Sequence, residues 1–191
     1  MTDGSDRRLR RLKPLDAGAL ARLLDREGAP RDAVSRGETR AVPLADAVSA
    51  ARLEEAAAEL DALSSGGVID WRRFDVTRFA ALMPSLAYLD RMEGEDGAPD
   101  FVYRFVGETI QQVARRTLRG ARISDILVGE ARRSILDEYA ACLDQRRPRA
   151  SIGRVVVSDM TWLRYLRLLY PAATDGTTPD RLLLIMLFAE G

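Results

Sequence analysis

The C-terminal part of the chain contains three strand-like segments in which both alternating sets of side chains are apolar. We expect strands over Ser151–Ser158, Trp162–Tyr170 and Arg181–Phe188. In the last of these, one alternating set is Leu182, Leu184 and Met186, and the other is Leu183, Ile185 and Leu187. A strand that faces water on one side has polar residues at every second position. The pattern therefore predicts strands covered on both faces, by helices of the same domain on one side and by an N-terminal helix or a partner chain on the other.

The preceding segments predict the rest of one domain. Phe101–Phe105 alternates aromatic residues with Val102 and Arg104, which is typical of a half-buried strand, and a short strand is expected over Leu86–Leu89. Thr109–Arg116 predicts a short helix and Ala131–Gln145 a longer one. We therefore expect an α+β fold with a five-stranded antiparallel sheet, helices on one face and an N-terminal helical extension.

The segment Leu44–Leu63 is rich in Ala, Leu and Glu and predicts one amphipathic helix. Its narrow apolar stripe consists of Ala50, Leu53, Ala57 and Leu60. Such a stripe needs cover, either from its own domain or from the same helix of a second chain. We divide the chain into a flexible extension with a short helix (1–40), the amphipathic helix (41–67) and the main domain (68–191).

The composition removes several classes of function. The chain has no histidine and a single lysine, Lys13, so His-based nucleophilic catalysis, His-ligated metals and a core Schiff-base lysine are excluded. Lys+Arg and Asp+Glu are both 29, and this zero net charge argues against nucleic acid as a partner. No apolar run approaches the roughly 20 residues of a membrane span. One cysteine, Cys142, is expected to be buried and structural, and we expect a cytoplasmic protein without metal or cofactor.

Several short segments, in their order along the chain, resemble the single-PAS-domain family common in alphaproteobacteria. They are Phe74–Pro84, Phe101–Ile110, Leu118–Gly120 and Tyr165–Pro171 with the following Asp175–Gly176. The resemblance covers roughly Trp71 to Glu190, and Tyr170 stands where an aliphatic residue is expected. It implies a small sensory or protein-interaction module that forms a homodimer through a helix N-terminal to the core. Applied to this chain, it points to the stripe on Leu44–Leu63 as the dimer contact.

The same resemblance implies that any ligand lies between the sheet and the helices, in a modest and mainly apolar cavity. The candidate lining residues are Tyr103, Phe105, Ile110, Ile126, Tyr139, Tyr165, Arg167 and Met186. Aromatic residues on strand faces are also typical of plain core. Arg104 and Arg167 each lie in an apolar strand, and two interpretations stay open: a solvent-facing arginine whose stem covers apolar surface, or a guanidinium that anchors a ligand.

These patterns favour a non-catalytic PAS-type sensory or interaction module in bacterial signal transduction, acting through a partner protein. The alternative is a small cavity enzyme with Asp/Tyr acid–base chemistry. A buried acid within reach of a buried tyrosine would favour the enzyme. Asp159 near a turn and Glu190 near the end are the few acids of the late strands, which favours the signalling module.

Overall fold

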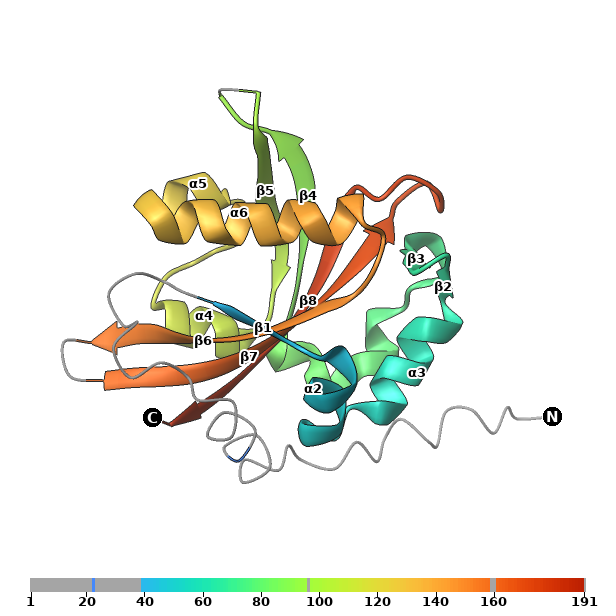
Figure 1. Cartoon of the computed structure of the whole chain (residues 1–191), viewed down its shortest axis with the longest axis horizontal. Helices are drawn as coiled ribbons and strands as arrows, with labels where there is room; N and C mark the ends of the chain where they lie inside the picture. Colours follow the sequence, from blue (N-terminus) through green and yellow to red (C-terminus); the bar gives the residue numbers. More distant parts are fainter. Residues whose placement is uncertain (1–21, 23–38, 96, 159–160, 191) are drawn as a thin grey trace.

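The computed structural model describes residues 22, 39–95, 97–158 and 161–190. Within them it shows an α+β fold built on one mostly antiparallel sheet (Figure 1). The elements are β1 (Arg40–Val42), α2 (Leu44–Ala50), α3 (Glu54–Ala62), β2 (Ser64–Ser65), β3 (Val68–Asp70), two 3₁₀ helices η4 (Trp71–Arg73) and η5 (Val76–Ser85), β4 (Leu86–Glu93), β5 (Pro99–Val106), α4 (Glu108–Ala114), α5 (Ile123–Ile126), α6 (Gly129–Asp144), β6 (Arg149–Ser158), β7 (Thr161–Ala173) and β8 (Arg181–Glu190). None of the helices described there combines the length and the apolar character that crossing a membrane requires.

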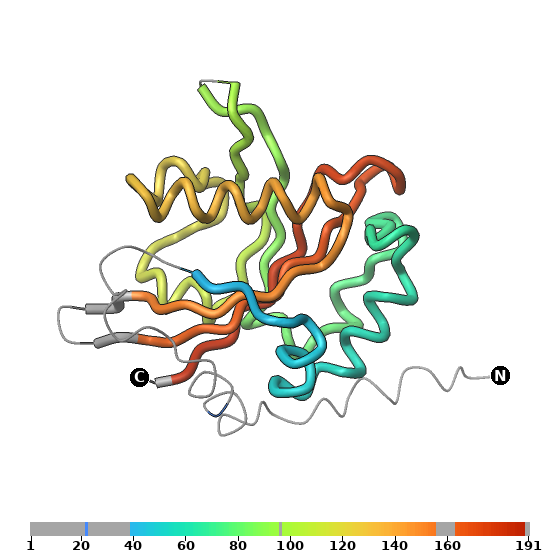
Figure 2. The backbone as a smooth tube through the Cα atoms, viewed as in Figure 1, coloured from blue at the N-terminus to red at the C-terminus, as the bar shows by residue number. Residues whose placement is uncertain are grey.

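The sheet has more strands than the five predicted. Its order is β1-β6-β7-β8-β4-β5, with antiparallel neighbours throughout, and β3 pairs in parallel with β7 and antiparallel with β2. Strand β1 lies on the open edge of β6, where Arg40 pairs with Ile152 and Val42 with Ala150. Figure 2 shows this segment running along β6 on the side where α6 lies. Its three residues are too few to show a periodicity, so the sequence does not predict this strand.

Apolar side chains cover both faces of the central strands, as the double alternation predicts. On β8, Leu183 and Ile185 belong to a core cluster with α2, α3 and η5, whereas Leu182 and Leu184 belong to a second cluster with α4 and α6. All four are at most 1% exposed. The N-terminal helices thus supply the second cover, which is one of the two expected alternatives, while the helices of the main domain lie on the other face (Figure 1).

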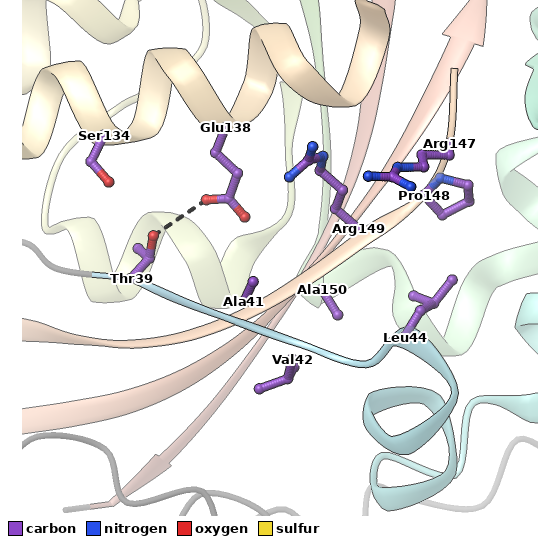
Figure 3. Close-up of a pocket in the computed structure, with 10 residues that line it drawn as sticks. All are labelled: Thr39, Ala41, Val42, Leu44, Ser134, Glu138, Arg147, Pro148, Arg149 and Ala150. Carbon is purple, nitrogen blue, oxygen red and sulfur yellow. Dashed lines mark hydrogen bonds between the residues drawn. The ribbon is translucent and has the colours of Figure 1, made fainter. Parts of the chain in front are cut away.

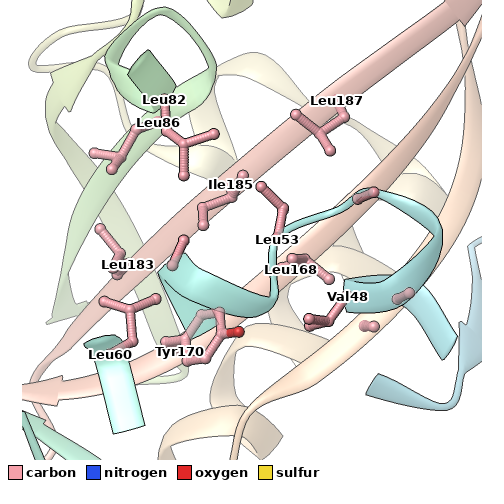
Figure 4. Packing of buried hydrophobic residues seen from close by; sticks show 14 of the residues in the cluster. Val48, Leu53, Leu60, Leu82, Leu86, Leu168, Tyr170, Leu183, Ile185 and Leu187 are labelled. Carbon is pink, nitrogen blue, oxygen red and sulfur yellow. The ribbon is translucent and has the colours of Figure 1, made fainter. Parts of the chain in front are cut away.

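The single helix predicted over Leu44–Leu63 is wrong. The chain leaves the helical path at Ala51–Leu53, where Arg52 has φ 54°, so α2 and α3 are separate. The break separates the segment that packs Val48 on the sheet from the segment that packs Leu60 there (Figure 4). Leu53 and Leu60 are 3% and 0% exposed within their own chain, whereas Ala50 and Ala57 are half-buried. The two leucines of the stripe therefore pack on the sheet of their own chain.

The alternation of Phe101, Tyr103 and Phe105 predicts that they share one face of the sheet. In the structure they do not. A register shift pairs Tyr88 with Phe105 but Leu89 with Tyr103, so Arg104 is an extra residue in β5. Such a β-bulge reverses the alternation beyond it. Phe101 and Tyr103 consequently face α6, while Phe105 stacks on Tyr88 on the opposite face, with ring centroids 5.7 Å apart.

The remaining elements agree with the prediction to within a few residues: α4, α6 and β6–β8 are all present. Gly107, after β5, is a glycine because the carbonyls of η5 approach it closely. A Cβ there would lie 2.1 Å from the carbonyl oxygen of Met83. The short helix predicted in the N-terminal extension and the acid Asp159 lie outside the residues that the structure describes. For Trp162 and Glu190 the structure describes the backbone but not the side chain.

Candidate functional site

A buried arginine lies beneath α6, on the sheet face of the second core cluster. Arg167, on β7, is 2% exposed. Its Nη2 donates to Glu138 Oε2 on α6, and its Nε donates to Ser151 Oγ on the neighbouring strand β6 at 3.2 Å. Strand pairing places Ser151 directly beside Arg167, and α6 crosses above both. The interpretation of Arg167 as a solvent-facing arginine is therefore wrong.

Two tyrosines flank this guanidinium. Its central carbon lies 5.3 Å from the Tyr139 ring centroid and 5.7 Å from that of Tyr165, within the range of a cation–π interaction. Burial raises the pKa of Tyr139, Tyr165 and the nearby Tyr103 above that of free tyrosine. The phenols therefore stay protonated near neutral pH and can donate hydrogen bonds.

Arg167 keeps its charge in this environment. Burial alone lowers the pKa of Arg167, but Tyr165, Tyr139 and Glu138 together raise it above the ordinary value. The Glu138 carboxylate, whose side chain is 13% exposed, neutralises that charge. The pair is thus an electrically neutral unit that joins α6 to the sheet.

Most of the predicted cavity residues do gather on this face. Tyr103, Tyr139, Tyr165 and Arg167 meet around the ion pair. Ile110, Ile126 and Met186 lie in the same core cluster. Phe105 does not, because the bulge turns it to the opposite face. Sequence reasoning missed Glu138, whose place on the inner side of α6 is a detectable signal.

A pocket opens beside this cluster, between α6, β1 and the start of β6 (Figure 3). We call it the seam pocket because its walls come from two parts of the chain. Its volume is about 360 Å³, and it is lined by Thr39, Ala41, Val42 and Leu44 on one side and by Ser134, Glu138, Arg147, Pro148, Arg149 and Ala150 on the other. Among the predicted cavity residues none lines this pocket. The closely spaced arginines after the long helix were the available signal for it.

Some polar groups of the seam pocket have hydrogen-bond partners among the described residues, and others do not. Glu138 Oε2 accepts a long hydrogen bond of 3.5 Å from Thr39 Oγ1 in addition to the contact with Arg167. Arg149 Nη2 donates to Gln145 Oε1 at 2.8 Å, but Arg149 Nε is buried and has no hydrogen-bond partner within the described part of the chain. The guanidinium of Arg147 makes no hydrogen bond or ion pair with the residues that the structure describes. Two cationic groups therefore have unused donors here.

A second pocket, of about 400 Å³, lies at β4 and β5 and is lined by Tyr88, Asp90, Tyr103, Arg104, Arg119, Gly120 and Arg181. Its charges are largely paired. Asp90 accepts from Arg104 Nε at 2.8 Å and from Arg181 Nε at 2.6 Å. Arg104 is exposed, which confirms its interpretation as a solvent-facing arginine. The guanidinium of Arg119 has no hydrogen bond or ion pair among the described residues, but no buried side-chain nitrogen of this pocket lacks a partner there, in contrast to Arg149 Nε of the seam pocket.

The Asp90 pairs predict an acid-sensitive contribution to stability. Burial raises the pKa of Asp90, but the hydrogen bonds from Arg181 and Arg104 lower it by a larger amount. The net pKa is therefore below the ordinary value of 3.8. The exposed Asp175, which accepts backbone hydrogen bonds from Thr178 and Thr177, has its pKa lowered to about 2. A carboxylate with a depressed folded-state pKa stabilises the protein above its unfolded pKa, and this stabilisation is lost as the pH falls through the folded value. We expect the urea concentration at the midpoint of unfolding to decrease as the pH is lowered below about 4.

In the Asp90→Asn variant we expect a loss of about 0.5–1 kcal/mol at neutral pH, after solvent screening, and a smaller decline on acidification. The exposed Asp137, which has no ion pair among the described residues, provides the control Asp137→Asn. Equal acid profiles for the wild type and Asp90→Asn would contradict the assignment.

Cys142 is fully buried on α6, as expected for a structural cysteine. Its Sγ donates to the Arg147 carbonyl at 3.4 Å, and burial raises the pKa of the thiol to about 12. A thiol of this kind is protonated at neutral pH and is a poor nucleophile. In the part of the chain that the structure describes, no group of three or more His, Cys, Asp or Glu side chains is arranged to hold a metal ion.

Comparison with known proteins assigns this chain to no family. A scan against protein-family models, a search of curated proteins and a search of solved structures each found no match. The site is therefore interpreted from its own residues.

Proposed function

We propose that this chain is a non-catalytic, PAS-type sensory or protein-interaction module of bacterial cytoplasmic signal transduction. It binds a small ligand in the seam pocket and passes its state to a partner protein. The observation that carries this proposal is the origin of the pocket walls. One wall is the N-terminal segment 39–44, and the other is formed by α6 and the start of β6.

The element order supports the PAS-type assignment. Strands β4 and β5 are followed by the short helices α4 and α5, the long helix α6 and the antiparallel strands β6, β7 and β8. This is the element order of a PAS domain, the kind of domain that the sequence resembles. The seam pocket also lies between a helix and the sheet, where the resemblance implies a ligand.

A ligand in the seam pocket can act as a switch because β1 is attached weakly. Strand β1 contributes only three residues to the sheet edge and leads through Pro43 directly into α2. A ligand that contacts both walls stabilises the docked state of this segment relative to a detached one. Ligand occupancy is then coupled to the position of segment 39–50, which a partner protein can recognise.

The alternative, a small cavity enzyme, has one observation in its favour: Glu138 is an acid close to the buried tyrosines Tyr139 and Tyr165. Its carboxylate is, however, ion-paired with Arg167. Burial also raises the pKa of both phenols, so neither is a base near neutral pH. These properties support binding rather than catalysis.

Native mass spectrometry of the purified full chain tests the proposal together with hydrogen exchange. We expect a retained small molecule whose removal increases exchange in 39–50 and leaves β7 and β8 unchanged. The pocket-filling variant Ser134→Trp should abolish retention, whereas Arg133→Trp, exposed on the same helix and outside the pocket, should not. Equal retention by both variants, or a ligand that leaves exchange in 39–50 unchanged, would refute the proposal.

A further inference from the structure

The unused donors of the seam pocket specify its ligand more closely. We infer that the pocket binds a small organic carboxylate with an apolar body. This inference rests on the proposed function, because it names the ligand class of the same pocket.

Two guanidinium groups supply the pocket with hydrogen-bond donors. In Figure 3 the side chains of Arg147 and Arg149 extend into the same part of the pocket, and neither is joined to Glu138 by a hydrogen bond. Arg149 Nε is buried and has no partner among the described residues, and buried N–H groups without a partner are uncommon in native proteins. A carboxylate satisfies this donor, because the guanidinium fork matches two carboxylate oxygens.

The net charge of the pocket lining is positive. Glu138 is its acidic residue, and Arg167 neutralises that charge. Arg147 and Arg149 have no counter-ion among the residues that the structure describes. Two guanidinium groups directed at one space repel each other unless an anion lies between them. A cationic ligand is disfavoured for the same reason.

The rest of the wall is partly apolar. Ala41 belongs to β1 and Pro148 directly precedes β6, whereas the side chains of Val42 and Ala150, which also border the pocket, are buried in the first core cluster. An apolar body can therefore contact both sides of the seam through Ala41 and Pro148. Inorganic phosphate makes no use of these side chains. A carboxylate with a short apolar or aromatic body uses both kinds of wall.

The test is a binding titration of the full chain, followed by amide NMR shifts, with four matched probes. These are phenylacetate, its neutral analogue phenylacetamide, the cation phenethylamine, and inorganic phosphate. We expect phenylacetate to bind best and to shift the signals of residues 39–44 and 147–150. Its affinity should fall at least about tenfold in Arg149→Gln, with a partial loss in Arg149→Lys, which keeps the charge but loses the fork.

Arg132→Gln is the matched control, since Arg132 is exposed on α6 and does not line the pocket. It should leave phenylacetate affinity unchanged, and the NMR spectrum of each variant verifies its fold. Equal binding of phenylacetamide, an unchanged affinity in Arg149→Gln, or no phenylacetate binding up to about 10 mM would overturn the inference. Tighter binding of phosphate than of phenylacetate would do the same. If the carboxylate assignment fails while native mass spectrometry still finds a retained ligand, the proposed function stands and only the ligand class is wrong.

Discussion

Replacement of Leu60 by aspartate should unfold the protein at room temperature. Leu60 is fully buried between α3 and the sheet, in the same cluster as Tyr170 and Leu183 (Figure 4). A carboxylate there has no cationic partner in this apolar cluster, and burying an unpaired charge costs many kcal/mol. Small domains have a total stability of only about 5–15 kcal/mol. Far-UV circular dichroism and urea titration measure the loss directly.

The matched control is Ala58→Asp, which places the same charge on the exposed side of α3. It should change the free energy of unfolding by no more than about 0.5 kcal/mol. The pair also tests homodimerisation through this stripe, which stays a prediction. If Leu60→Asp gives a well-folded monomer while the wild type is a dimer by light scattering, the stripe pairs chains and the intramolecular packing is wrong. Unfolding of Leu60→Asp alone supports sheet cover.

Replacement of Glu138 by alanine should destabilise the protein by about 3–5 kcal/mol. The variant leaves the Arg167 charge in the core beside Ser151 and three tyrosines, and none of these described neighbours is an anion at neutral pH. The cost comes from a buried charge without a counter-ion rather than from the lost contact itself. Chemical denaturation at neutral pH measures it, and Asp137→Ala, exposed one residue earlier on α6, is the control.

A double substitution separates this cause from simple loss of packing. Glu138→Leu combined with Arg167→Met removes both charges and keeps most of the volume. Replacing both members of a buried pair by apolar residues is often neutral or stabilising, so the double variant should be more stable than Glu138→Ala. A double variant that is less stable than the single one would show that the pair itself contributes net stability.

The features that could be predicted from the sequence depend on local periodicity. The double alternation of β8 predicts cover on both faces, because side chains point to opposite sides at every residue and a polar residue is needed wherever one side meets water. Helix α6 follows from the inner spacing of Ile135, Tyr139 and Cys142 in the same way. These patterns hold whatever the neighbouring elements are.

Other features depend on how distant segments meet, and periodicity carries no information about them. The bulge at Arg104 is determined by the pairing of β5 with β4, and it alone moved Phe105 away from the predicted cavity. The break at Arg52 allows two short helices to follow the curved sheet, whereas the intrinsic preference of the segment favours one continuous helix. Tertiary packing outweighs a preference of a few tenths of a kcal/mol per residue.

The sequence by itself therefore determined the chemistry available to this protein and the two-sided burial of its sheet. The absence of histidine and the apolar alternation of the late strands are properties of composition and order alone. Only the tertiary structure decided that Arg167 is buried against Glu138, and that Arg147 and Arg149 meet segment 39–44 in one pocket. The physical reason is that an arginine in a strand is equally compatible with solvent and with a buried counter-ion, and the choice depends on which helix crosses above it.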